Sequence, residues 1–303
     1  MKMKTTKRIG AMNKMTTRDF VNKIAKQIEQ LMEKHGTDWT KPWIGQGGGI
    51  PYNPARQQQY TGANVFGLWM QGANAGYTSN EWGTYKQWEA LGKQVDKGQK
   101  SQAFSIFYSK VEREDADDYH VMRLSRVFNA EQLVGYEPDI LKEKVNEVDT
   151  LDAVDKFIES IPSVVKTGSG RAFYNPVDDY IMMPPAKAFI DTEDATATQS
   201  YYSTMLHEHA HWTGHKSRLD RLSNNQDKKS YAYEELVAEL TSVLMSVHLG
   251  IAKTPTADHA KYLNHWRQAI RNNPRVIMKA MADAEKAMKH LNSYSQNAVD
   301  KAA

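Results

Sequence analysis

The chain has 303 residues and no cysteine, and its 39 basic and 36 acidic side chains leave a formal net charge of +3. This length accommodates two ordinary domains, while the absence of cysteine excludes a disulfide framework and thiolate metal ligands. No window approaches the ~18 apolar residues of a membrane span, and no apolar signal-peptide segment follows the basic first residues. We therefore expect two α+β domains in a reducing, cytoplasmic setting without a membrane partner.

The basic charge is concentrated in the first part of the chain. Residues 1–110 contain 16 Lys and Arg against seven acidic residues, a net charge of +9, so the remainder carries −6. Such an asymmetry favours an anion-binding N-terminal domain. Between residues 137 and 159 the composition becomes acidic, and we place the domain boundary near residue 140.

The N-terminal half begins with a basic stretch without periodicity, which predicts a flexible arm over residues 1–15. Thr16 is a suitable N-cap for an amphipathic helix over residues 16–34. Ten aromatic residues then occur within residues 39–88, interrupted by glycines and polar residues. The further predicted elements are a loop at 54–62, a short helix at 64–73, and strands at 103–108 and 121–128 joined by a hairpin tip at 112–118.

The C-terminal half is predicted to form a second domain over residues 141–292. Its expected elements are a helix at 151–161, strands at 171–175 and 180–183, helices at 198–212 and from Ser230 to about residue 249, and a final helix at 257–291 that breaks near Pro274. Gly214 is expected just beyond the first long helix. Residues 293–303 are predicted to be a frayed tail, and the strand at 180–183 is a candidate edge for an extended peptide.

The strongest chemical signal is His207-Glu208-His209-Ala210-His211 within one predicted helix. Histidines four residues apart lie on the same helical face, so His207 and His211 can converge on one cation, most plausibly Zn²⁺. Glu208 is placed to act as general base for a water molecule that the metal activates. The alternative is that both histidines are ordinary helix residues, and the following helix argues against it.

That following helix supplies carboxylates at a spacing of four. Glu235 and Glu239 share one face, so we assign Glu235 as the third metal ligand and Glu239 as the acceptor that orients His207 or His211. Glu234 is the alternative ligand. His215 and Ser217 are rejected: Gly214 separates His215 from the helix, and serine occupies the place where a third histidine would be needed.

A tyrosine could stabilise the oxyanion of a peptidase reaction. Five candidates lie near the motif in sequence, and the sequence does not choose among them: Tyr174, Tyr201, Tyr202, Tyr231 and Tyr233.

The aromatic N-terminal region is compatible with single-stranded nucleic acid, whose bases stack on exposed rings for about 1–3 kcal/mol each. A sugar-binding or peptide-binding surface would look similar. Most of these rings are expected in a core, including Phe66, Trp69, Trp82 and Trp88, because they lie in apolar surroundings.

Motifs in both halves resemble one known family. Residues 60–65 (YTGANV), 82–87 (WGTYKQ), 97–98 (KG) and 127–129 (VFN) are similar to the N-terminal domain of the ArdC antirestriction family, which TraC-type primases share. Residues 183–185 (MPP), 207–221 (HEHAHWTGHKSRLDR) and 234–240 (EELVAEL) resemble the zincin-like metallopeptidase domain of that family. The resemblance extends from about residue 16 to residue 291. His209 and Tyr85 are modest departures, because the family often has an apolar residue and a phenylalanine at these two positions.

The resemblance implies a plasmid or phage protein that protects incoming DNA from host restriction. Residues 16–140 would bind single-stranded DNA, and the peptidase domain could act on a host restriction or defence protein. An alternative is a non-catalytic DNA-coating protein whose metal is structural, and a third is a general processing peptidase. The candidate DNA contacts are Lys41, Trp43, Arg56, Tyr60, Asn64, Trp82, Tyr85, Lys86, Lys97 and Lys100.

Overall fold

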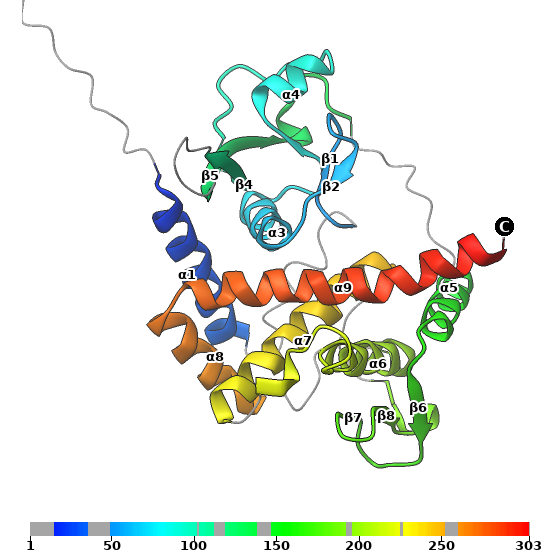
Figure 1. The fold of residues 1–303 in the computed structure, drawn as a ribbon. Coiled ribbons are helices and arrows are strands. Elements are labelled where there is room, and N and C mark those ends of the chain that lie inside the picture. Colours follow the sequence, from blue (N-terminus) through cyan, green and yellow to red (C-terminus); the bar gives the residue numbers. More distant parts are fainter. Residues whose placement is uncertain are drawn as a thin grey trace, which may run out of the picture.

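The structure is a computed structural model that describes residues 15–35, 49–101, 103–111, 119–137, 147–191, 196–224, 227–251 and 260–302. The predicted arm, the hairpin tip at 112–118, the domain boundary near 140, and the candidate DNA contacts Lys41 and Trp43 fall outside these ranges. The architecture is α+β in two parts, as predicted, with the long helix α9 (Arg275–Ala302) running between them (Figure 1).

The first helix, α1 (Thr17–His35), begins where the sequence predicted. The Thr16 hydroxyl accepts from the backbone N–H of Asp19 at 3.1 Å, and the Asp19 carboxylate accepts from the N–H of Thr16, so both orphan donors are satisfied. One face of α1, carrying Phe20, Ile24 and Ile28, is buried.

The N-terminal sheet is built on one hairpin. Strand β4 (Ala103–Val111) pairs antiparallel with β5 (Tyr119–Asn129), and the short β3 (Trp82–Gly83) adds to the other side of β5. A second ribbon joins β1 (Tyr52–Asn53) to β2 (Gln58–Gln59), and β2 falls inside the segment 54–62 that was predicted as a loop. The capping box of Thr84 starts α4 (Tyr85–Ala90), a helix that the sequence analysis did not predict.

Helix α3 (Ala63–Ala75) closes part of the free edge of β4 with two side-chain amides. Asn64 accepts from the N–H of Ile106 and donates to its carbonyl oxygen, and Gln71 does the same for Phe104. An amide group therefore replaces a neighbouring strand at each position, which keeps the backbone groups of the edge paired.

The C-terminal part contains a three-stranded sheet in the order β6-β8-β7 and the helices that cover it. Helix α5 (Glu147–Ser160) precedes β6 (Val164–Thr167), β7 (Phe173–Asn175) and β8 (Tyr180–Met183). β8 is the central strand, with β6 parallel and β7 antiparallel to it, so the expectation that residues 180–183 form a free edge was wrong. Both of its backbone edges are already occupied.

Two long helices follow the sheet and pack on each other. They are α6 (Ala197–Thr213) and α7 (Lys228–His248). α7 is capped by Asp227, whose carboxylate accepts from the N–H groups of Lys229 and Ser230, so Ser230 is the third helical residue and not the predicted cap.

The final helices are α8 (Ala260–Asn272) and α9, separated at Pro274 as predicted. α9 continues to Ala302, which corrects the expectation of a frayed tail over 293–303. α1 packs on α8 and is tied to it by ion pairs from Arg267 and Arg271 to Glu29.

One hydrophobic cluster crosses from the first half of the chain to the second. It includes Phe20 and Phe66 from the N-terminal half and Leu240 and Met281 from the C-terminal half. The two sequence domains therefore share a core. No helix in the described part of the chain is long and apolar enough to cross a membrane.

Candidate metal centre

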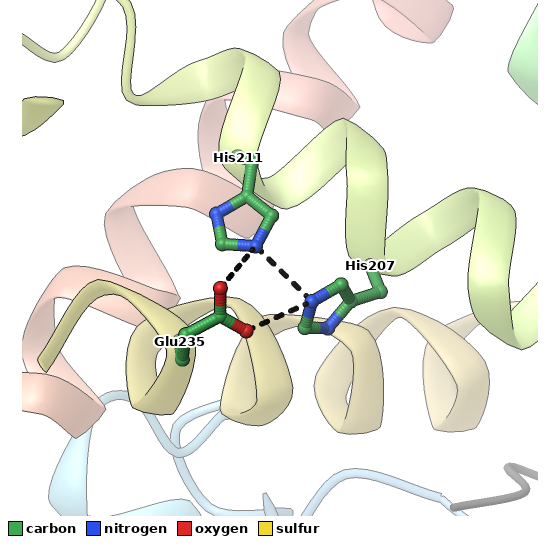
Figure 2. Close-up of side chains that lie close together, drawn as sticks. All are labelled: His207, His211 and Glu235. Atoms are coloured by element: carbon green, nitrogen blue, oxygen red, sulfur yellow. Dashed lines mark hydrogen bonds and ion pairs between the residues drawn. The ribbon is translucent and has the colours of Figure 1, made fainter. Parts of the chain in front are cut away.

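The two histidines of the motif converge as their spacing predicted. α6 starts at a capping box formed by Thr196 and Gln199, and about three to four turns later it directs His207 and His211 toward α7 (Figure 2). Their Nε2 atoms are 3.1 Å apart and His207 is 4% exposed. Placing two imidazoles this close in the interior favours a shared cation between them.

Glu235 completes the triad from α7. Its two carboxylate oxygens lie 3.6 Å from Nε2 of His207 and 3.7 Å from Nε2 of His211. Ligands bonded to a tetrahedral metal at about 2.0–2.1 Å are separated by roughly 3.4 Å, so the three donors fit a divalent cation. Within the described residues this is the one group of three or more His, Cys, Asp and Glu side chains that could hold a metal ion.

The carboxylate of Glu234 lies behind the ring of His211. Glu234 lies 3.4 Å from Nδ1 of His211 and receives two hydrogen bonds from the Arg221 guanidinium, at 3.0 and 2.9 Å. Glu234 therefore contacts Nδ1 of His211, the ring nitrogen that faces away from the triad. It does not lie at the metal position, where the alternative ligand would have to be. Glu239 is fully buried one turn beyond Glu235, and its predicted contact with a histidine stays a prediction.

Arg221 anchors this arrangement to the end of α6. It also donates to the carbonyl oxygen of Ala210 at 2.8 Å and to the hydroxyl of Thr213 at 3.0 Å. At Gly214, a Cβ atom would lie 3.1 Å from the Arg221 guanidinium and from the carbonyl oxygen of His211. Glycine at the helix end therefore lets the arginine reach Glu234.

The charges around the triad oppose the effect of burial. Burial lowers the pKa of His211, but hydrogen bonding to Glu234 and the charges of Glu235 and Glu208 outweigh it and raise that pKa to about 9. For Glu235, burial raises the pKa, but His207 and His211 outweigh it and lower the pKa to about 2. The carboxylates around the two histidines therefore favour binding of a positive charge at the triad.

Glu208 is next to His207 on α6 and is only 7% exposed. Its charge contributes to the raised pKa of His211, so its carboxylate lies close to the triad. A buried carboxylate adjacent to His207 in sequence is compatible with the role of general base.

His209 is a structural residue inside the motif. It is fully buried, with Nδ1 2.8 Å from the carbonyl oxygen of Met205 and Nε2 2.9 Å from the hydroxyl of Ser163. Burial lowers the pKa of His209 to about 4, so the ring is neutral at physiological pH. It joins α6 to the segment before β6.

The structure separates the five candidate tyrosines. Four of them have other roles: Tyr174 binds Asp179, Tyr202 binds Asp155, Tyr233 binds Asp283, and Tyr201 packs on the ring of Tyr202. Tyr231 is 49% exposed and its hydroxyl hydrogen-bonds Glu235, which contributes to the low pKa of that carboxylate. Tyr231 is thus the tyrosine beside the donor triad.

A second network links the β7–β8 turn to the end of α6. Arg218 donates to both carboxylate oxygens of Asp179 and to the Tyr174 hydroxyl, and its guanidinium lies 3.9 Å from the centre of the Trp212 ring. Hydrogen bonds from Arg218 outweigh desolvation and lower the pKa of Asp179 to about 2. Arg218 thereby holds the sheet against the metal helix.

The candidate DNA contacts fall into two groups. Trp82 is 2% exposed in a core cluster, so its ring is not accessible for stacking, and the amide of Asn64 is hydrogen-bonded to the backbone of Ile106. Tyr60 is half-buried, with its hydroxyl on the carbonyl oxygen of Trp82. The exposed candidates are Arg56, Tyr85, Lys86, Lys97 and Lys100.

The fold and site define a zincin-like metal-binding protein with an additional N-terminal domain. Residues 152–283 match the family model described as a zincin-like metallopeptidase, and residues 16–148 match the N-terminal domain of the anti-restriction factor ArdC. The metal-free crystal structure of the antirestriction protein ArdC from plasmid R388 is similar, with 33% identity, a TM-score of 0.73, and coverage of 92% of this chain and 98% of that one. The chain belongs to the ArdC antirestriction family.

Further comparisons extend this relationship. The Mn(II)-bound structure of the R388 protein matches with the same TM-score and identity, over 91% of this chain and 98% of that chain. An uncharacterized protein of Sinorhizobium fredii, y4eC, is 31% identical over 93% of this chain and 94% of its own length. A DNA primase TraC of Escherichia coli is 31% identical over 92% of this chain, which spans 28% of that primase.

Proposed function

We propose that this protein protects incoming DNA from restriction by binding single-stranded DNA through its N-terminal domain and cleaving a host restriction or defence protein in its C-terminal domain. The convergence of His207, His211 and Glu235, with buried Glu208 beside them, carries the peptidase part of the proposal. A purely structural metal site would not need a carboxylate beside the ligands or a half-exposed tyrosine at its mouth.

The chain's own residues have separate tasks in peptide hydrolysis. Glu208 accepts the proton of the attacking water and passes it to the leaving amine. The Tyr231 hydroxyl, which donates to Glu235 in the free protein, turns to donate to the oxygen of the scissile carbonyl as negative charge develops there. Glu234 and Arg221 hold His211 in one ring orientation. When bound, the divalent metal supplies Lewis acidity at the carbonyl.

Zinc is the proposed metal, because two imidazoles and one carboxylate in a tetrahedral arrangement suit Zn²⁺. The Mn(II)-bound structure of the R388 protein makes manganese the competing possibility. Elemental analysis of protein purified without added metal tests this, and a stoichiometric content of manganese with no zinc would contradict the assignment.

The Glu208→Gln variant tests catalysis. It keeps the size and polarity of the side chain and leaves the three metal ligands in place, so metal content and Tm should match those of the wild type. Protection of unmodified DNA entering a restricting host should fall to the level of a His207→Ala variant. Full protection by Glu208→Gln with bound metal would instead support a non-catalytic, DNA-coating protein.

The DNA-binding part rests on the exposed basic residues of the N-terminal domain and on the matched ArdC domain. Fluorescence anisotropy with a labelled oligothymidylate, repeated across salt concentrations, measures it. We expect the affinity to fall as salt rises, with a slope of about −0.7 for each phosphate contacted. A processing peptidase with a peptide-binding first domain would show no such affinity.

A further inference from the structure

A cleft of about 680 Å³ lies between the N-terminal domain and α9, away from the metal centre. Its walls come from the β1–β2 ribbon, the start of α3, the sheet formed by β4 and β5, and one face of α9. This volume is within the range of small-molecule sites, about 300–1,000 Å³. The cleft is therefore large enough for one nucleotide.

The sheet side of the cleft presents two neutral hydroxyls. Ser105 on β4 and Ser125 on β5 are direct cross-strand partners and both line the cleft. Ser105 is only 8% exposed, and neither serine hydroxyl donates a hydrogen bond within the described residues. A partly accessible hydroxyl that donates no hydrogen bond within the protein is available to the polar edge of a ligand.

An aromatic ring and a guanidinium follow the serines on the same face of the sheet. Phe107 is two residues after Ser105, lines the cleft, and is 40% exposed. Its cross-strand partner is Arg123, whose Nε donates to the hydroxyl of Ser109 at 2.7 Å. An exposed ring beside a positioned cation is the combination that single-stranded nucleic acids use, base on ring and phosphate on cation.

The ribbon wall and the α9 wall of the cleft differ in charge. This difference determines which way round a nucleotide would lie in the cleft. Arg56 is exposed on the ribbon wall and makes no ion pair with any described residue. Glu285 on the α9 wall is paired with Lys289 and lies against Gly62 at the start of α3. A phosphate is therefore favoured on the side of Arg56 and disfavoured beside Glu285, since both residues line the cleft.

We propose that this cleft binds one unpaired nucleotide of the strand held by the N-terminal domain, with its base on Phe107 and against Ser105 and Ser125 and its phosphate near Arg56. The inference rests on the proposed single-strand binding and assigns a position to it.

Anisotropy titrations of the full chain with labelled oligothymidylate test the assignment. Phe107→Ala should weaken binding by roughly 5- to 150-fold, the range that loss of one base–aromatic stack produces. Leu91→Ala is the matched control, because Leu91 is 42% exposed in the same domain and does not line the cleft. Arg56→Ala should reduce the salt slope by about 0.7, the value for one single-strand phosphate. Wild-type Tm in each variant shows that the fold is retained.

Photo-crosslinking locates the base directly. An oligonucleotide carrying 5-iodouracil, irradiated with the full chain and digested with trypsin, should mark the peptide of residues 101–110. If Phe107→Ala bound with wild-type affinity, or if crosslinks were confined to other peptides, the assignment of the nucleotide to this cleft would be overturned. The proposal of single-strand binding itself would remain. Failure of the wild type to bind the oligonucleotide at any salt concentration would overturn the proposed function itself.

Discussion

Arg221 holds the carboxylate of Glu234 through two hydrogen bonds, at 3.0 and 2.9 Å. Glu234 in turn faces Nδ1 of His211, so a residue from the loop after α6 controls the orientation of a metal ligand. Outer contacts of this kind determine how strongly a ligand holds its metal. The relationship leads to the first prediction.

Glu234→Gln should weaken metal binding about 10- to 100-fold, because the amide cannot provide the negative charge that stabilises His211 as a donor. Titration against a chelator of known affinity measures the change. Arg275→Ala, an exposed substitution at the start of α9, is the control. An unchanged metal affinity in Glu234→Gln would show that Glu234 has no influence on the ligand.

Metal should stabilise the folded chain. The donors come from two helices, so the cation joins α6 to α7 and binds the unfolded chain poorly. At a metal concentration 100 times the Kd, the expected gain is about 2.7 kcal/mol, which raises Tm by several degrees. Thermal unfolding with metal and with chelator measures this gain, and Glu235→Gln should reduce it sharply while Glu208→Gln retains it.

The amides that close the edge of β4 should matter for stability. Gln71→Met removes the amide at similar size and leaves the N–H and C=O of Phe104 without that partner, at a cost of about 1–3 kcal/mol. Urea denaturation gives the free energy of unfolding. Gln59→Met, at an exposed position on β2, should change it little, and equal stability of the two variants would contradict the bridging role.

The Asp179–Arg218 pair should give an acid-sensitive contribution to stability. The folded pKa of Asp179 is about 2, below the usual 3.8, so the contribution is complete above pH 4 and disappears as the pH falls through 2. The side chain is 38% exposed, so we expect about 1 kcal/mol or less. The Tm difference between wild type and Asp179→Asn should shrink over that range, and a constant difference would contradict this explanation.

Local spacing was sufficient to predict that His207, His211 and Glu235 come together, because the two histidines are one helical turn apart and Glu235 lies on the next helix. The partner of His211 was not predicted, since Glu234 is placed by Arg221, a contact that depends on how the intervening loop folds. Glu239 had the more regular helical spacing, but spacing alone does not reveal an arginine arriving from outside the helix.

The candidate DNA contacts show a different limit of prediction from sequence. Composition suggested that rings and amides in the N-terminal region meet a ligand, but Trp82 fills a core cluster and Asn64 completes a strand edge. Phe107, Ser105 and Ser125 escaped notice because a strand of mixed polarity does not reveal which residues face each other across a hairpin. β6 was missed for a similar reason: its four residues are exposed and leave no apolar pattern.

α9 contacts both halves of the molecule (Figure 1). Ala282 lines the cleft, while Asp283 binds Tyr233, the residue just before Glu234 and Glu235. The R388 protein, y4eC and TraC each match over more than nine-tenths of this chain, although TraC is much longer. Because α9 packs on α3 in the first half and on α7 in the second, a chain cut between the halves would leave one of them without a helix that covers it.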